Sequence, residues 1–174
     1  MPKLEVLIDQ ETIRKRVAEL ADEIRTDYAD RHPILIGVLK GSFVFMADLI
    51  RALNMPVEID FIGISSYGSG TESSGKIEIV SGLKSALEGR DVLVIEDIAD
   101  TGLSLSFLLT CLRARKPSSL KVCALFNKPS RRKVPLTIDY SGFDIPDEFV
   151  VGYGLDYDEK YRYLPDLCVL EEES

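Results

Sequence analysis

The sequence predicts an α/β protein built on a mainly parallel sheet. Three segments, 34–39, 92–95 and 120–126, are short apolar runs without alternating polar residues. Such runs are typical of strands that are buried on both faces of a parallel sheet. Each of the first two runs is followed by a turn of small residues and then by a segment that is compatible with a helix. This repeated strand–helix–strand order favours parallel strands joined by right-handed crossovers.

Length and composition indicate a single domain, 1–174, with its own core. The net charge of −8 argues against a general binder of nucleic acid or of anionic membranes. No apolar run approaches the ~20 residues of a membrane span, and the N-terminal residues do not resemble a signal peptide. Cys111, Cys123 and Cys168 show no C-x-x-C spacing. We therefore expect buried, reduced cysteines in a cytoplasmic protein.

The remaining elements follow from shorter patterns. Residues 11–28 form an amphipathic helix, because apolar residues recur at helical spacing and Asp9 is a suitable N-cap. Further helices are expected over 43–53 and from 103 to about 115. Further strands are expected over 57–64, 76–80 and 167–170.

Residues 65–75, with the sequence S-S-Y-G-S-G-T-E-S-S-G, are the low-complexity tract of the chain. By composition they predict a flexible loop, and a linker or a wide hairpin is the structural interpretation. A loop of this length in a compact domain is often a lid over a site.

The stretch from 92 to 104, V-L-V-I-E-D-I-A-D-T-G-L-S, carries the densest polar chemistry of the chain. We expect Glu96 and Asp97 to end the strand, and Asp100 to stand in the turn that opens a helix. Ligands of open α/β sheets bind at this end of the strands, where a helix start offers unpaired N–H groups and the positive end of the macrodipole. Gly102 permits close approach of the backbone. A phosphate therefore fits the turn, and the carboxylates suit a metal-bound or hydroxyl-rich group.

Two other interpretations begin from the same residues. Acidic residues after a strand are often solvated, and Asp100 alone is also an ordinary helix N-cap. Aspartyl-nucleophile phosphatases carry D-x-D-x-T after a hydrophobic strand, but here two residues separate Asp97 from Asp100. The acidic pair, the D-T-G turn and the hydroxyls of Thr101 and Ser104 together favour a binding site.

This stretch resembles the phosphoribosyl-diphosphate-binding motif of the type I phosphoribosyltransferases. Asp100 makes it similar to their hypoxanthine-guanine branch, since the adenine and orotate branches usually carry a non-acidic residue there. Three more segments match in family order, namely the diphosphate loop in 39–49, the mobile loop after residue 64 and the purine-binding hood that begins at 149. The resemblance covers roughly 34–170. Ala99 departs from it mildly, because the family more often has a larger aliphatic residue at that position.

The resemblance implies a type I phosphoribosyltransferase fold, a mainly parallel twisted sheet flanked by helices with a small hood. The hood would be formed by about 1–10 and 145–174, and a mobile lid by about 65–76. It also implies purine salvage, in which the 5-phosphoribosyl group passes from phosphoribosyl diphosphate to hypoxanthine and/or guanine, giving IMP or GMP and diphosphate. The implied partners are those substrates and a second copy of the chain, as a homodimer or homotetramer, with no nucleic acid and no membrane.

The resemblance also assigns roles to residues. Asp100 would be the general base, and Mg²⁺ would be held by Asp156 with Glu96 and Asp97. The substrate-binding residues would be Lys40, Gly41, Ser66, Tyr67, Glu96, Asp97, Asp100, Thr101, Gly102, Leu103, Ser104, Lys128, Phe149, Val150 and Arg162. Among these, Lys128 would donate to the 6-oxo group, Phe149 would stack on the base and Val150 would read its edge by its backbone. Lys40 and Arg162 would contact the diphosphate, and the peptide before Lys40 is often cis in the family.

Two alternatives stay open. One is a phosphoribosyltransferase for another base, such as xanthine, adenine or orotate. Asp100 and Lys128 argue against the last two. The other is a nucleotide-sensing regulator of the same fold that binds RNA. Its only basic cluster would be Arg131-Arg132-Lys133, which we interpret as a solvated turn or subunit contact. His32, before a proline in a polar turn, receives no role.

Overall fold

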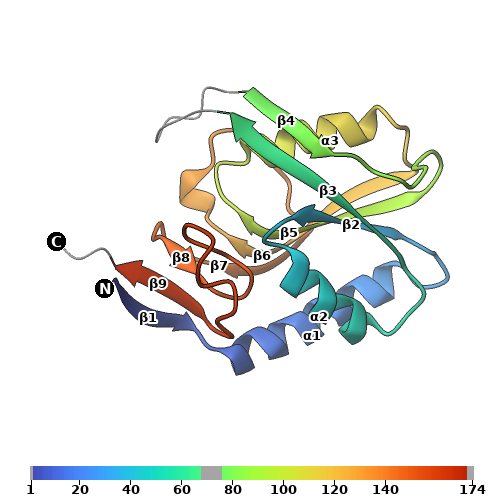
Figure 1. Cartoon of the computed structure of the whole chain (residues 1–174). Helices are drawn as coiled ribbons and strands as arrows, with labels where there is room; N and C mark the ends of the chain where they lie inside the picture. The colour runs from blue at the N-terminus through green and yellow to red at the C-terminus, as the bar shows by residue number, and fades with distance from the viewer. Residues whose placement is uncertain (1, 68–75, 172–174) are drawn as a thin grey trace.

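The structure, a computed structural model, describes residues 2–67 and 76–171. The strands of these residues are β1 (Lys3–Ile8), β2 (Ile34–Leu39), β3 (Glu58–Tyr67), β4 (Lys76–Ser81), β5 (Asp91–Ala99), β6 (Ser119–Asn127), β7 (Tyr140–Asp144), β8 (Val150–Val151) and β9 (Leu167–Glu171). They form a six-stranded sheet in the order β4-β3-β2-β5-β6-β7 and a three-stranded sheet in the order β1-β9-β8 (Figure 1).

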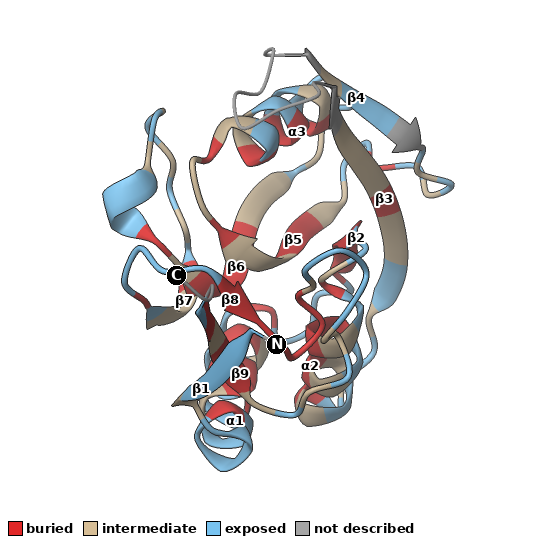
Figure 2. Cartoon of the chain, turned by 60° about the vertical axis from the view of Figure 1, so that its left-hand side comes forward, coloured by how far each residue is buried: buried red, intermediate tan, exposed pale blue. Residues whose placement is uncertain are grey.

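The six-stranded sheet is mainly parallel. Its pairs β2–β3, β2–β5, β5–β6 and β6–β7 are parallel, while β4 runs antiparallel to β3 at one edge. Helices α1 (Gln10–Asp27) and α2 (Phe43–Leu53) share one core cluster with Leu35 and Leu93, and α3 (Leu103–Arg113) shares another with Ile34 and Val92. Successive residues of one strand thus face opposite helix layers, and the central strands β2 and β5 are buried on both faces along most of their length (Figure 2). The predicted fold class is confirmed.

The helices begin where the sequence indicates. Asp9 is the N-cap of α1, and its side chain accepts a 2.8 Å hydrogen bond from the backbone N–H of Thr12. The buried face of α1 consists of its predicted apolar residues with Ala21. Helix α2 has the predicted bounds, while α3 ends at Arg113, two residues before the expected end.

Two strands extend beyond their predicted ends. β5 runs through Glu96 and Asp97 as far as Ala99, because its backbone pairs with β6 up to Ala99 opposite Asn127. The expectation that the two carboxylates end this strand is therefore wrong. β3 continues to residue 67, since 65–67 pair with β4, so the loop begins later than predicted. The rest of the predicted loop, 68–75, lies outside the described residues.

The three-stranded sheet joins the two ends of the chain. β1 pairs antiparallel with β9, and β9 with β8. Neither β1 nor β8 is a strand that the sequence predicts as such, and β7 is also missed. The segment after β8 packs closely against the turn between β2 and α2. A Cβ built on Gly154, whose φ is +95°, would lie 2.5 Å from the carbonyl oxygen of Gly41.

No helix among the described residues is long and apolar enough to cross a membrane. Cys111, Cys123 and Cys168 are all free thiols; Cys123 and Cys168 are buried as predicted, whereas Cys111 is half-buried.

Candidate active site

A cavity of about 480 Å³ lies where the carboxyl ends of β2, β5 and β6 meet the segment 147–162. Ligand sites of open α/β sheets occupy this position. Its lining consists of Lys40, Gly41, Asp97, Ile98, Asp100, Lys128, Arg131, Asp147, Glu148, Phe149, Val150, Leu155, Asp156 and Arg162. Residues more than 100 positions apart in the sequence therefore line the same cavity.

Nine of the predicted site residues line this cavity, from Lys40 to Arg162. Glu96 and the turn 101–104 adjoin it in the chain but are not part of its lining. The backbones of Ser66 and Tyr67 pair with β4, and their side chains lie outside the described part of the structure.

Glu96 and Asp97 form an acidic pair of half-buried side chains. Burial raises the pKa of Glu96 well above its usual range, and the charge of Asp97 raises it further. Burial also raises the pKa of Asp97, although Arg162 is among the groups that lower it. Asp97 accepts a 2.8 Å hydrogen bond from the backbone N–H of Ile98. The backbone of Gly41 lies so close that a Cβ there would be 1.9 Å from Oδ2 of Asp97.

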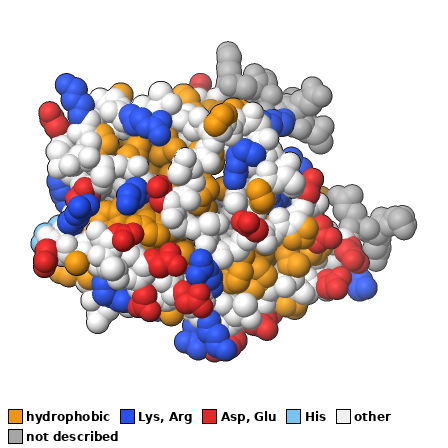
Figure 3. Space-filling view, turned by 180° about the vertical axis from the view of Figure 1, so that it is seen from behind, with side chains coloured by type: hydrophobic (Ala, Val, Ile, Leu, Met, Phe, Trp, Pro, Cys, Tyr) orange, Lys and Arg blue, Asp and Glu red, His pale blue; other side chains and the backbone are white. Residues whose placement is uncertain are grey.

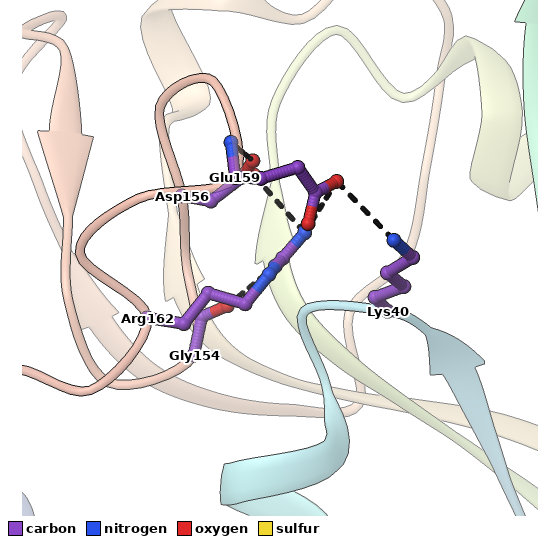
Figure 4. Close-up of polar contacts among 5 residues, drawn as sticks. All are labelled: Lys40, Gly154, Asp156, Glu159 and Arg162. Carbon is purple, nitrogen blue, oxygen red and sulfur yellow. Dashed lines mark hydrogen bonds and ion pairs between the residues drawn. The ribbon is translucent and has the colours of Figure 1, made fainter.

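Two cations share one carboxylate at the rim of the cavity (Figure 4). Nζ of Lys40 is 3.2 Å from Oε1 of Glu159, and Nη2 of Arg162 is 3.6 Å from the same oxygen. Arg162 also lies 3.4 Å from Oδ1 of Asp156 and donates a 2.7 Å hydrogen bond to the carbonyl of Gly154. Lys40 and Arg162 are thus arranged to hold an anion between them, and Glu159 supplies one. The peptide between Leu39 and Lys40 is cis, as the resemblance predicts.

Lys128 is a buried cation with an open donor. Lys128 comes directly after β6, and its backbone N–H donates a 2.9 Å hydrogen bond to the carbonyl of Ala99. The residue is only 6% exposed, and its ammonium group has no hydrogen bond or ion pair within the described residues. Phe149, which lines the same cavity, is 51% exposed, with Tyr157 packed edge-on at 5.5 Å. The cavity therefore offers a buried donor together with an open aromatic ring.

Arg131 contacts Asp100, which the sequence analysis did not anticipate. Its Nε is 2.7 Å from Oδ1 of Asp100, and its Nη1 is 3.3 Å from Oδ1 of Asp147. The two carboxylates, Asp147 first, raise the pKa of Arg131. The neighbouring Arg132 donates a 2.8 Å hydrogen bond to the carbonyl of Asp100. Pro129–Arg131 is a 3-10 turn and the Arg131 side chain is 44% exposed, as expected of a solvated turn, but both arginines also contact Asp100.

Residues 5–158 match the family described as phosphoribosyl transferase domain. The chain belongs to the phosphoribosyltransferase family.

Similar phosphoribosyltransferases cover almost the whole chain. The hypoxanthine-guanine phosphoribosyltransferase of Bacillus subtilis (strain 168) is 51% identical over 166 residues, which are 95% of this chain and 92% of the relative. In the bifunctional TilS/HprT protein of Listeria monocytogenes, 97% of this chain matches 26% of the relative at 48% identity. A crystal structure of a hypoxanthine phosphoribosyltransferase from Staphylococcus aureus superposes with a TM-score of 0.92 at 46% identity, and the match covers 96% of this chain and 91% of that one.

In this phosphoribosyltransferase the turn after β5 has the form that a phosphate requires. Gly102, with φ of +85°, is the N-cap of α3, and because glycine has no side chain it does not cap the first N–H groups of the helix. The backbone N–H of Leu103 has only a long contact, 3.4 Å, to the hydroxyl of Thr101. The first amides of α3 are therefore available to an anion, together with the hydroxyl of Ser104.

The acidic residues fit a magnesium ion that keeps its waters. No group of three or more His, Cys, Asp or Glu side chains within residues 2–67 and 76–171 converges on one point. Magnesium in phosphoryl sites needs only one or two carboxylates with waters and phosphate oxygens. Asp97 and Asp156 both line the cavity and together offer the one or two carboxylates that such an ion needs.

Proposed function

We propose that the 480 Å³ cavity is where this enzyme of purine salvage transfers the 5-phosphoribosyl group from phosphoribosyl diphosphate to hypoxanthine or guanine, giving IMP or GMP and diphosphate. One observation carries the assignment of the base site. The buried Lys128 and the exposed ring of Phe149 line the same cavity, and the ammonium group of Lys128 has no hydrogen-bond partner within the described residues. A 6-oxopurine supplies a planar ring to stack on Phe149 and a carbonyl oxygen to accept from Lys128.

The chemistry assigned to the residues follows from the charges in the reaction. The ribose passes through an oxocarbenium-like state, so the leaving diphosphate must be stabilised and the purine nitrogen made nucleophilic. Asp100, at the cavity wall, takes a proton from the imidazole side of the purine. Lys40 and Arg162 contact the diphosphate, and the turn from Asp100 to Ser104 binds the 5′-phosphate.

A magnesium ion would be held by Asp156, with the Glu96–Asp97 pair, and would supply positive charge to the leaving diphosphate. The same acidic pair engages the ribose hydroxyls, directly or through a metal-bound water. Val150, at the start of β8, presents its backbone to the edge of the base.

Removal of the Lys128 donor tests the base site. Lys128→Met keeps the aliphatic stem but leaves the 6-oxo oxygen unpaired, so we expect KM for hypoxanthine to rise roughly 10- to 100-fold. KM for phosphoribosyl diphosphate should change little. Steady-state kinetics with each substrate varied in turn measure both. Lys15→Met, on the exposed face of α1, is the matched control. An unchanged KM for hypoxanthine would remove Lys128 from the base site.

Glu159 competes with the diphosphate for the same cations. Because Lys40 and Glu159 are largely exposed, their pairing is weak, and we expect Glu159→Gln to lower KM for phosphoribosyl diphosphate by about two- to fivefold. Asp158→Asn is the control, since this neighbouring acid pairs with Lys160 and contacts neither Lys40 nor Arg162. If KM rises in the Glu159 variant, or both variants behave alike, the two cations do not bind the diphosphate.

The assay for the whole proposal measures nucleotide formation from phosphoribosyl diphosphate and magnesium with hypoxanthine, guanine, xanthine, adenine and orotate in parallel. We expect turnover of 6-oxopurines only, and the assay ranks xanthine among them. Turnover of adenine or orotate would contradict the roles of Asp100 and Lys128.

The regulator alternative finds little support on the surface. On the face seen from behind, basic side chains are interspersed with acidic ones and form no continuous basic area (Figure 3). Of the basic cluster, Arg131 and Arg132 are engaged with Asp100. Absence of turnover with every base, together with binding of structured RNA on filters at low salt, would favour the regulator.

The organisation of the chain completes the proposal. We place residues 1–174 in one domain, with the three-stranded sheet as its hood, and we assign it to the cytoplasm, where free thiols persist. We also infer a homodimer or homotetramer. Sedimentation equilibrium distinguishes these states, and a monomer at working concentration would contradict the assembly.

A further inference from the structure

The segment after β6 is bound along the turn after β5. The backbone N–H of Lys128 donates to the carbonyl of Ala99 at 2.9 Å, and that of Lys133 donates to the carbonyl of Thr101 at 2.9 Å. Between them, the 3-10 turn η1 (Pro129–Arg131) closes with a 3.1 Å hydrogen bond from the N–H of Arg131 to the carbonyl of Lys128. The backbone of Arg131 is therefore held beside Asp100 whatever its side chain does.

The side chain of Arg131 makes its closest contact with Asp100 at one carboxylate oxygen, Oδ1. Oδ1 of Asp100 is shielded from solvent and accepts no hydrogen bond of good geometry, so the 2.7 Å ion pair with Nε of Arg131 is its compensation. Oδ2 of Asp100 accepts no hydrogen bond within the described residues and, unlike Oδ1, is not shielded from solvent. A carboxylate held in this way has one oxygen fixed and one oxygen open to accept a proton.

Arg131 has a second anionic partner across the cavity. Its Nη1 lies 3.3 Å from Asp147, in the segment that leads to Phe149. When Asp100 takes a proton and loses its charge, Asp147 still compensates Arg131. The arginine can therefore keep its place through the proton transfer.

We propose that Arg131 is a positioning residue that orients the Asp100 carboxylate for proton abstraction from the purine. The inference rests on the proposed role of Asp100 as the base. It assigns to Arg131 a function in the chemical step and none in binding phosphoribosyl diphosphate.

Two substitutions separate orientation from simple structural support. Arg131→Gln removes the charge, and because the pair is partly exposed we expect kcat to fall about fivefold, with KM for phosphoribosyl diphosphate within about twofold of the parent. Arg131→Lys keeps the charge and should restore most of kcat. The control is Lys133→Gln, an exposed charge of the same cluster whose side chain makes no hydrogen bond or ion pair within the described residues. Equal kcat in the Gln variant and its parent, or no rescue by lysine, would overturn the proposal.

A double-mutant cycle with Asp100→Asn tells this inference apart from the proposed function. If Arg131 acts through Asp100, Arg131→Gln lowers kcat in the parent and has no further effect in the Asn background. An equal loss in both backgrounds would overturn the positioning role and leave Asp100 as the base. Near-parental kcat in the Asp100→Asn variant alone would overturn the base assignment itself.

Discussion

Replacement of Asp100 by asparagine is expected to lower kcat by about 10²- to 10⁴-fold, the usual contribution of general acid–base catalysis. The amide has the shape of the carboxylate and still fits beside Arg131, but it cannot accept the proton of the purine. The backbone of Asp100, whose carbonyl accepts from Arg132, remains unchanged. KM for phosphoribosyl diphosphate should therefore stay close to that of the parent. Steady-state kinetics and a calorimetric titration with the sugar diphosphate measure the two effects separately.

The control for this loss is Asp30→Asn, the same substitution in the exposed turn after α1. It should leave both kinetic constants unchanged. A turnover near the parental value in the Asp100 variant would contradict the base role. A parallel loss of sugar-diphosphate binding would instead place Asp100 chiefly in the phosphate turn.

Gly41→Ala should impair binding of phosphoribosyl diphosphate while the chain still folds. The new Cβ would lie 1.9 Å from Oδ2 of Asp97, so the Asp97 carboxylate must turn away from its place in the cavity. Misplacement of a positioning group by about 1 Å can cost on the order of 100-fold, and we expect KM for phosphoribosyl diphosphate to rise by about that factor. The clash involves the end of a side chain and not backbone, so the loss in unfolding free energy should stay within about 1–3 kcal/mol.

Gly82→Ala provides the matched control, since a Cβ at Gly82 meets no atom within 4 Å. Kinetics and thermal unfolding of both variants give the comparison. Normal KM in Gly41→Ala would show that Asp97 adapts without loss and would remove it from sugar-diphosphate binding. An unfolded Gly41 variant would show that the close approach serves the fold. In that event Asp97→Asn, which leaves Gly41 in place, carries the test of binding.

The sequence predicted the central elements well where local pattern and packing coincide. β2 and α2 have the predicted bounds because an apolar run, a turn of small residues and an amphipathic segment follow one another from 34 to 53. The end of β5 could not be predicted from local pattern. Its polar residues are held in the strand by hydrogen bonds to β6, a partner that begins 20 residues after β5 ends.

The edge strands lacked a local signal. β1 carries mostly exposed residues, and it is a strand because β9, from the other end of the chain, pairs with it. β7 has the sequence Y-S-G-F-D, in which no apolar run marks a strand, and it is a strand because β6 pairs with it. Such pairings are decided by contacts between distant segments.

The sequence by itself determined the strand–turn–helix units and the charged residues at their ends, because periodicity, turn chemistry and residue type are local properties. Only the tertiary structure decided which of these residues meet. Glu159 reaches Lys40 across 119 positions of the chain, and Arg131 reaches Asp100 because β6 lies parallel to β5 and both end at the same edge. Composition indicated only a solvated turn or subunit contact for Arg131, and did not indicate its ion pair with Asp100. The parallel register of two neighbouring strands brought it to the cavity.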